Sequence, residues 1–233
     1  MASGLPGSVQ QSAATKQPST ASATESAADA ELTSAASTIE KQLPNWVRAW
    51  REIDPEFNPA AFVKLRGETT VPSGDGSHSP RQKDRLRELI LVYSPDRSRF
   101  IDPYTGMDLW EEDGRVMAGF DVDSGVAIVD LRDNTWRQVL FCGTQCSFED
   151  AAWIDTDRFL VVGSVIFWPE DGRPDCPEPA EEGAKRSCVA PALYVVDLAK
   201  NTVSSYLGPT TKGWTKSYFG GYLKAKFPNI VFD

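Results

Sequence analysis

Four cysteines are the residues of this sequence with the clearest capacity for covalent or metal chemistry. They are Cys142, Cys146, Cys176 and Cys188. Cys142 and Cys146 are separated by three residues, whereas redox enzymes and zinc ribbons use the Cys-x-x-Cys spacing, and no histidine lies near them. We therefore expect structural disulfides rather than a zinc site.

The spacing of the cysteines also suggests how they pair. Cys176 and Cys188 bracket a polar segment that has no large apolar side chain to anchor it, so a covalent link is the expected means of ordering its base. A bridge there would close a loop of about a dozen residues and stabilise the fold by about 3 kcal/mol. Cys142 and Cys146 form the second pair. Two disulfides favour an exported protein, and four reduced thiols in a cytoplasmic protein are the alternative.

Paired carboxylates are the second kind of candidate chemistry, because glycoside hydrolysis needs an acid and a base that converge on the sugar. Asp121, Asp123 and Glu149 are the carboxylates considered for this role, with tryptophan rings stacking on the sugar. Asp121 and Asp123 also match the first half of a calcium loop, but no acidic residue follows at its distal end. A turn explains that spacing better than a metal site.

The remaining polar candidates are better explained as surface residues of turns and loops than as catalytic or metal-binding residues. Glu111, Glu112 and Asp113 are adjacent, so a strand would splay them to both faces, and we interpret them as part of a solvated turn. The single histidine, His78, lies in a Gly-, Ser- and Pro-rich loop without nearby metal ligands. The sequence shows no nucleophile motif, metal cluster or phosphate loop, which favours a non-catalytic protein without cofactor or metal.

Aromatic residues offer candidate binding surfaces at both ends of the chain. Trp46 and Trp50 lie one helical turn apart on an apolar stripe, and we expect them to pack in the core rather than stack on a sugar. Trp214, Tyr218 and Tyr222 belong to an aromatic tail that either lines an exposed groove or closes the fold by packing. Packing is the favoured interpretation, and the three remain candidate binding residues.

A sequence motif that occurs twice indicates the strands that position these candidate residues. Ile128 to Thr135 returns as Val195 to Thr202, and each copy is an apolar run that ends in Asp-Leu, followed by a polar turn that ends in Asn-Thr. This pattern is typical of a β-hairpin. Upstream, Tyr93 to Ile101 resembles Trp153 to Leu160, so each unit begins with another hairpin.

The length of the repeat indicates a blade-like sheet. Asp130 and Asp197 are about 67 positions apart, but the second unit carries a Pro-, Glu- and Cys-rich insertion at residues 167–190. Without it the period is about 43 residues, close to the roughly 40–50 residues of a four-stranded propeller blade. From Leu89 to Leu207 the chain resembles bacterial β-propeller repeat proteins. The resemblance implies antiparallel sheets and carries over no chemistry.

We therefore expect an all-β fold of antiparallel blade-like sheets, as a partial propeller or two-sheet sandwich, with one N-terminal helix. An amphipathic apolar pattern runs from Thr38 to Ile53, and Pro44 is best placed in the first turn of a helix that extends to about Glu52. Residues 1–37 are rich in Ala, Ser and Thr and are predicted to form a disordered tether, although the part from Ser26 can become helical. Residues 38–233 form the single domain.

Charge and composition narrow the range of possible binding partners. The 233-residue chain has a formal net charge of −9, which argues against nucleic acid and anionic membranes as partners. No apolar run approaches the roughly 20 residues of a membrane span, and no secretory signal is visible. Either the protein is cytoplasmic, or its signal has been removed, since such tethers commonly follow the cleavage site of periplasmic proteins and lipoproteins.

The sequence therefore predicts a non-catalytic, exported binding protein on a β-repeat fold, located in the periplasm or cell envelope, with another protein as partner. A bacterial immunity protein that blocks a toxin is one instance of this class. The alternative is a carbohydrate-active hydrolase that uses a carboxylate pair.

Overall fold

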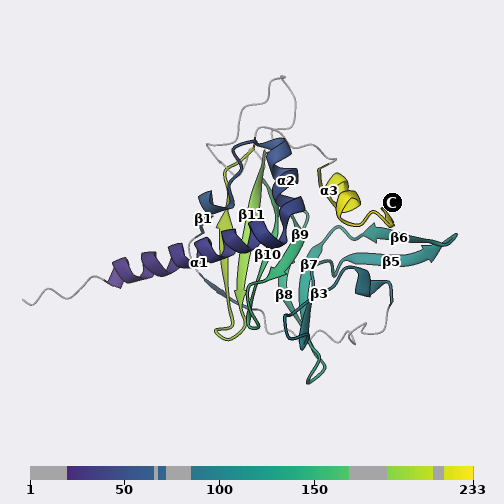
Figure 1. Cartoon of the computed structure of the whole chain (residues 1–233), viewed down its shortest axis with the longest axis horizontal. Helices are drawn as coiled ribbons and strands as arrows, with labels where there is room; N and C mark the ends of the chain where they lie inside the picture. Colours follow the sequence, from purple (N-terminus) through teal and green to yellow (C-terminus); the bar gives the residue numbers. More distant parts are fainter. Residues whose placement is uncertain (1–19, 66–67, 72–84, 168–187, 212–217, 233) are drawn as a thin grey trace, which may run out of the picture.

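The computed structural model describes residues 20–65, 68–71, 85–167, 188–211 and 218–232 (Figure 1). Within these residues the protein is mainly β, with three sheets and three α-helices. Two short 3-10 turns lie at Pro59–Ala61 and Arg87–Leu89. The predicted all-β fold is confirmed.

The two copies of the repeated motif form two antiparallel sheets of the same design. The first repeat sheet has the order β3-β4-β7-β8, and the second has the consecutive order β9-β10-β11-β12. These strands are β3 (Val92–Tyr93), β4 (Arg99–Asp102), β7 (Ser124–Asp130), β8 (Thr135–Cys142), β9 (Cys146–Trp153), β10 (Arg158–Phe167), β11 (Cys188–Asp197) and β12 (Thr202–Leu207). β1 (Val63–Lys64) and β2 (Thr69–Thr70) extend the second sheet beyond β12. The blade-like sheets are thus confirmed, and the described strands do not close into a ring.

Matching turns close the two hairpins of the motif. Asp130 pairs with Thr135 at the end of β7–β8, and Asp197 occupies the same place in β11–β12. Asn134 and Asn201 in these turns have φ angles of 56° and 57°. Asparagine tolerates this left-handed conformation better than most side chains, so the Asn-Thr pair marks the tight turn in both copies.

An insertion interrupts both repeats at the same point, between the second and third strands. In the first repeat it contains the hairpin of β5 (Met107–Glu112) and β6 (Arg115–Phe120), which projects from the body of the molecule (Figure 1). β13 (Ile230–Phe232) adds to β6 in parallel and completes a three-stranded hairpin sheet. In the second repeat, residues 168–187 lie outside the described residues. Each unit therefore carries an insertion, whereas the sequence pattern indicated one only in the second. The first insertion precedes Asp130, so it does not contribute to the 67-residue spacing between Asp130 and Asp197.

The N-terminal region forms two helices rather than one. α2 (Pro44–Ile53) begins at Pro44 as predicted, but α1 (Thr20–Gln42) precedes it. Ala35 is fully buried and Ile39 packs beside it, so ordered structure begins earlier than the predicted boundary at residue 37. Small residues such as Ala carry little signal for burial, yet they let a helix approach a sheet closely. Residues 1–19 lie outside the described part.

The second repeat sheet is covered on both faces. Leu160 and Val162 of β10 pack under α1 and α2, whereas Phe159 and Val161 pack against the first repeat sheet. Burial on both faces explains why β10 is a continuous apolar run instead of an alternating one. Trp46 and Trp50 of α2 are 0 % exposed in the first of these cores, so their predicted core packing is confirmed.

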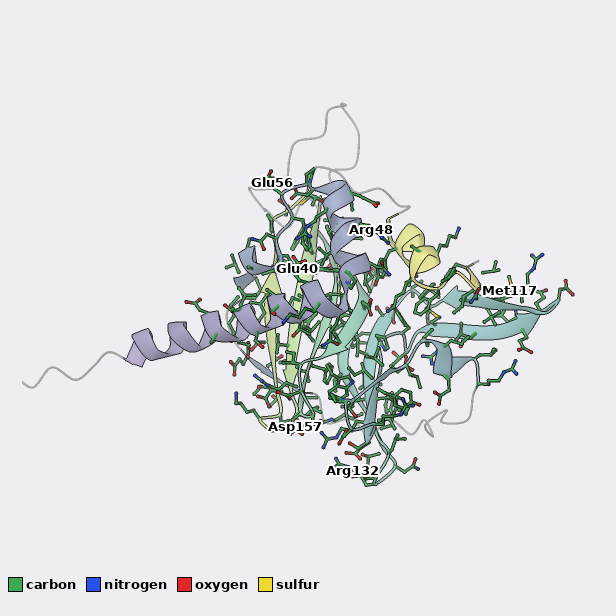
Figure 2. The ribbon with its side chains drawn as sticks, in the orientation of Figure 1. Glu40, Arg48, Glu56, Met117, Arg132 and Asp157 are labelled. Carbon is green, nitrogen blue, oxygen red and sulfur yellow. A yellow bond between two sulfur atoms is a disulfide. The ribbon has the colours of Figure 1, made fainter. Side chains whose placement is uncertain are left out.

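Arg99 joins the turns of the two repeats. Its guanidinium contacts the Asp130 carboxylate at 2.8 Å in the first repeat and the Asp157 carboxylate at 2.8 Å in the second. Arg132 and Asp157, labelled in Figure 2, lie at the same end of the molecule as this bridge. No helix within the described residues is long and apolar enough to cross a membrane.

Candidate functional site

A pocket lies where the inserted β5–β6 hairpin leaves the first repeat. It has a volume of about 260 Å³ and is lined by residues from three segments, 104–107, 120–125 and 146–148. The first two segments are the connections at the base of the hairpin, and the third is the beginning of β9. The pocket therefore lies between the two repeats.

The floor of the pocket is apolar and its edge carries exposed apolar side chains. Tyr104, Met107 and Phe148 line it and are at most 3 % exposed. At the mouth, Phe120 is 42 % exposed and Val122 is 74 % exposed. Such a lining favours an apolar group over a charged one at the bottom.

Asp121 and Asp123, two of the candidate carboxylates, stand beside each other at this mouth. Both come from the β6–β7 connection and both are exposed. The Asp121 carboxylate accepts a hydrogen bond from the Val122 amide at 2.6 Å. Neither forms an ion pair with a lysine or arginine in the described part of the chain. The two carboxylates add negative charge to one side of the opening.

The Cys142–Cys146 disulfide borders the pocket. The bridge spans the β8–β9 connection with its Cα atoms 5.9 Å apart, and Cys146 is a lining residue. This predicted bridge is confirmed, and it fixes the start of β9 relative to β8. Cys188 is also disulfide-bonded. Its predicted partner, Cys176, lies outside the described residues, so that pairing stays a prediction.

Behind the pocket, a β-bulge brings two consecutive carboxylates into the interior. Val162 pairs with Asp150 and Gly163 with Phe148, so Glu149 is the extra residue of β9. A Cβ atom on Gly163 would lie 2.0 Å from the Ser147 carbonyl oxygen, which only glycine avoids. The bulge breaks the usual alternation of strand side chains, and Glu149 and Asp150 are both buried.

Neutral donors from three described residues contact the Glu149 carboxylate. The Trp46 indole donates to it at 2.7 Å, and the Ser164 hydroxyl donates at 2.6 Å. The Ser147 hydroxyl lies 3.4 Å away. A carboxylate that is 0 % exposed needs such partners, because burying it without them would cost several kcal/mol.

Asp150 is held by residues of the C-terminal helix, α3 (Tyr218–Lys226). The Lys226 ammonium and the Tyr222 hydroxyl both donate to its carboxylate. Lys226 also donates to the Tyr104 hydroxyl at 3.0 Å, and that hydroxyl donates to the Glu149 carbonyl oxygen. These contacts form one polar cluster of four buried residues and the partly buried Lys226; the four are Tyr104, Glu149, Asp150 and Tyr222.

Burial raises the pKa of both cluster tyrosines. For Tyr222 and Tyr104 alike, desolvation is the main cause, and the nearby Asp150 carboxylate raises each pKa further. Both phenols therefore stay protonated and remain hydrogen-bond donors at neutral pH. The Tyr104 ring forms part of the pocket floor while its hydroxyl belongs to the cluster, so the two features share a wall.

The predicted site residues fall in different places. Asp121 and Asp123 line the pocket, whereas Glu149 lies in the cluster and does not line it. No tryptophan is among the described lining residues, and the two aspartates come from one side, so this arrangement gives no support to a facing carboxylate pair. Within the described residues no group of three or more His, Cys, Asp or Glu side chains is placed to hold a metal ion.

The aromatic tail and the acidic run are placed as follows. Tyr222 is 3 % exposed and packs in the interior, in agreement with the favoured interpretation of the tail. Trp214 and the side chain of Tyr218 lie outside the described residues, as does His78. The predicted solvated turn is present at the tip of the β5–β6 hairpin, where Asp113 has a φ of 49°.

Asp150, Lys226 and Tyr104 are the cluster residues that the sequence pattern did not single out. One signal was available, because two adjacent acids stand in an apolar strand between Phe148 and Ala151. Consecutive charges in a buried strand indicate either a bulge or buried partners. The identity of those partners, more than 70 positions away in the case of Asp150, carries no local signal.

Comparison of the chain with protein-family models, with curated proteins and with solved structures gives no match.

Proposed function

We propose that the protein is a non-catalytic binding protein that acts outside the cytoplasm and engages another protein around the pocket. The observation that carries this proposal is the exposure of large apolar side chains there. Phe120 and Val122 stand at the mouth, and Phe141, which pairs with the lining residue Gly125, is 63 % exposed. We call Phe120, Val122 and Phe141 the apolar rim. Exposed apolar side chains that gather beside a pocket mark interaction surfaces, whereas single exposed ones elsewhere on a protein are common.

The polar cluster supports the non-catalytic part of the proposal. Glu149 and Asp150 are the buried acids closest in chain to the pocket, and their oxygens accept hydrogen bonds from Trp46, Ser164 and Lys226. A general acid or base must be able to reach the substrate proton. These carboxylates instead act as internal acceptors that attach helices to β9.

The disulfides support action outside the cytoplasm. The Cys142–Cys146 bridge and the oxidised Cys188 are features of proteins that fold in an oxidising compartment. A net charge of −9 adds a preference for basic partners. A toxin-blocking immunity protein, tethered in the periplasm or carried on a lipid anchor, is the instance of this class that we favour.

Site-specific photo-crosslinking tests the proposal. A benzoylphenylalanine probe replaces Phe141 in one sample and Val63 in the control, because Val63 is 69 % exposed on β1, at the opposite edge of the second repeat sheet. Each protein is illuminated with the envelope fraction of the source organism. We expect a discrete protein adduct from position 141 alone.

Equal adducts from both positions, or none from either, would contradict the proposal. A parallel screen against glycan substrates tests the hydrolase alternative. Turnover that is lost in Asp121→Asn would favour that alternative and would count against a purely binding role.

A further inference from the structure

The size of the pocket limits what it can hold. Its volume of about 260 Å³ exceeds the roughly 150 Å³ of a cavity that accepts benzene, and it is below the roughly 300–1,000 Å³ of pockets for drug-sized ligands. The space therefore matches one large side chain. Interfaces commonly place a single anchor residue in a pocket of this kind.

The chemistry of the walls changes from the floor to the mouth. Tyr104, Met107 and Phe148 make the floor apolar, and the Tyr104 hydroxyl is already bonded within the polar cluster. Met107 can adapt to different shapes because its side chain is flexible and polarisable. An apolar group at the bottom of the pocket would therefore not disturb the hydrogen bonds that the Tyr104 hydroxyl makes within the cluster.

The negative charge at the mouth determines which kind of residue can lie next to the bound apolar group. Asp121 and Asp123 are exposed at one side of the opening, and no described lysine or arginine pairs with either. A cation placed there would meet two carboxylates at the edge of an apolar wall, where electrostatic attraction is less screened than in open water. A second anion at the same place would be repelled.

We propose that the pocket binds one large apolar side chain of a partner protein that carries a lysine or arginine immediately beside it. This inference rests on the proposed function and specifies the chemistry of the partner. The apolar side chain contacts Tyr104, Met107 and Phe148, and the neighbouring cation lies against Asp121 and Asp123. The apolar rim then packs against the rest of the partner.

Short peptides provide the probes. Acetylated and amidated lysine–phenylalanine–lysine is titrated into the full-length, isotope-labelled protein, with lysine–alanine–lysine and glutamate–phenylalanine–glutamate as matched peptides. Amide shifts are followed at Gly106, Gly125 and Phe148, which line the pocket. We expect saturable shifts at these amides for the first peptide, and binding weaker by about fivefold or more for the other two.

Two variants and their controls test the site. Val122→Lys places a competing cation at the mouth, and Val63→Lys is its control, since both positions are highly exposed. Asp121→Asn with Asp123→Asn removes the two charges, and Glu52→Gln with Glu56→Gln makes the same change of net charge on α2 and just after it, outside the pocket lining. We expect each pocket variant, and neither control, to weaken binding of lysine–phenylalanine–lysine about fivefold.

Equal binding of the three peptides, or equal loss in the control variants, would overturn the inference. Phenethylammonium that binds as tightly as the basic peptide would also overturn it, because a small cation would then be the sufficient ligand. A crosslinked partner at position 141 without peptide shifts would refute the pocket chemistry and leave the proposed function standing. Peptide shifts without any crosslinked partner would count against the proposed function instead.

Discussion

The Lys226 ammonium and the Asp150 carboxylate form an ion pair that attaches the C-terminal helix α3 to the bulged strand β9. The side chains of the pair are 19 % and 8 % exposed, so the contact is largely withdrawn from water. The same helix leads into β13, which pairs with β6 of the inserted hairpin. The ion pair thus connects β9 with the C-terminal segment that pairs with the hairpin, and the base of that hairpin forms the pocket.

Breaking this ion pair should destabilise the protein. Lys226→Met leaves the Asp150 carboxylate buried without its cation, and we expect the free energy of unfolding to fall by about 3 kcal/mol. Lys224→Met is the control, because Lys224 is exposed on the same helix and should change stability by less than about 0.5 kcal/mol. Urea denaturation measures both, and equal stabilities of the two variants would show that the pair is dispensable.

A pair of glycine substitutions should have opposite effects. Gly163→Ala places a Cβ atom 2.0 Å from the Ser147 carbonyl oxygen and should cost about 3 kcal/mol or abolish the bulge. Gly221→Ala on α3 meets nothing within 4 Å and should stabilise by about 0.5–1 kcal/mol. Thermal unfolding compares the two variants. A neutral effect at Gly163 would mean that β9 does not need its bulge.

Acid should weaken the bridge between the repeats. Hydrogen bonds from Arg132, and then from Arg99, hold the pKa of Asp130 well below its ordinary value, although partial burial acts in the opposite direction. A depressed pKa in the folded state gives stability above the unfolded value near 4, and this stability is lost as the pH falls through the folded pKa. Unfolding measured from about pH 6 to pH 2 should therefore show a smaller loss in Asp130→Asn than in the wild type or in Glu56→Gln.

The oxidation state of the cysteines is tested by thiol titration. The unreduced, denatured protein should contain no free thiols, because Cys142 and Cys146 are bridged, Cys188 is disulfide-bonded, and Cys176 is its predicted partner. Replacing both Cys142 and Cys146 by serine should cost about 2 kcal/mol, the value expected for a very short closed loop. Detection of four free thiols would remove both bridges and the main support for an extracytoplasmic location.

Local sequence signals were sufficient to predict the repeat hairpins and α2. The Asp-Leu and Asn-Thr pairs encode tight turns, and Pro44 marks a first helical turn, so each feature depends on neighbouring residues alone. The all-β sheets follow from these hairpins. The burial of Trp46 and Trp50 in the core could also be predicted from a local apolar stripe.

The pocket and the polar cluster depend on contacts that no local pattern records. Asp150 meets Lys226 and Tyr222 only because a bulge turns its side chain inward and β13 brings the C-terminal segment beside β6. The early start of α1 has a similar cause. Ala35 is buried by a sheet whose strands come much later in the chain. Alanine does not contribute to a recognisable apolar stripe, so no local signal in the sequence indicated this burial.

The central claim is that partner binding occurs at the pocket and its apolar rim, and crosslinking efficiency in two backgrounds tests it most directly. The probe at position 141 is combined with Val122→Lys at the mouth or with Val63→Lys at the distant sheet edge. Both parent residues are highly exposed, so both backgrounds should keep wild-type stability within about 0.5 kcal/mol. We predict that Val122→Lys lowers the adduct yield by about tenfold while Val63→Lys leaves it unchanged. Equal yields in the two backgrounds would contradict the claim.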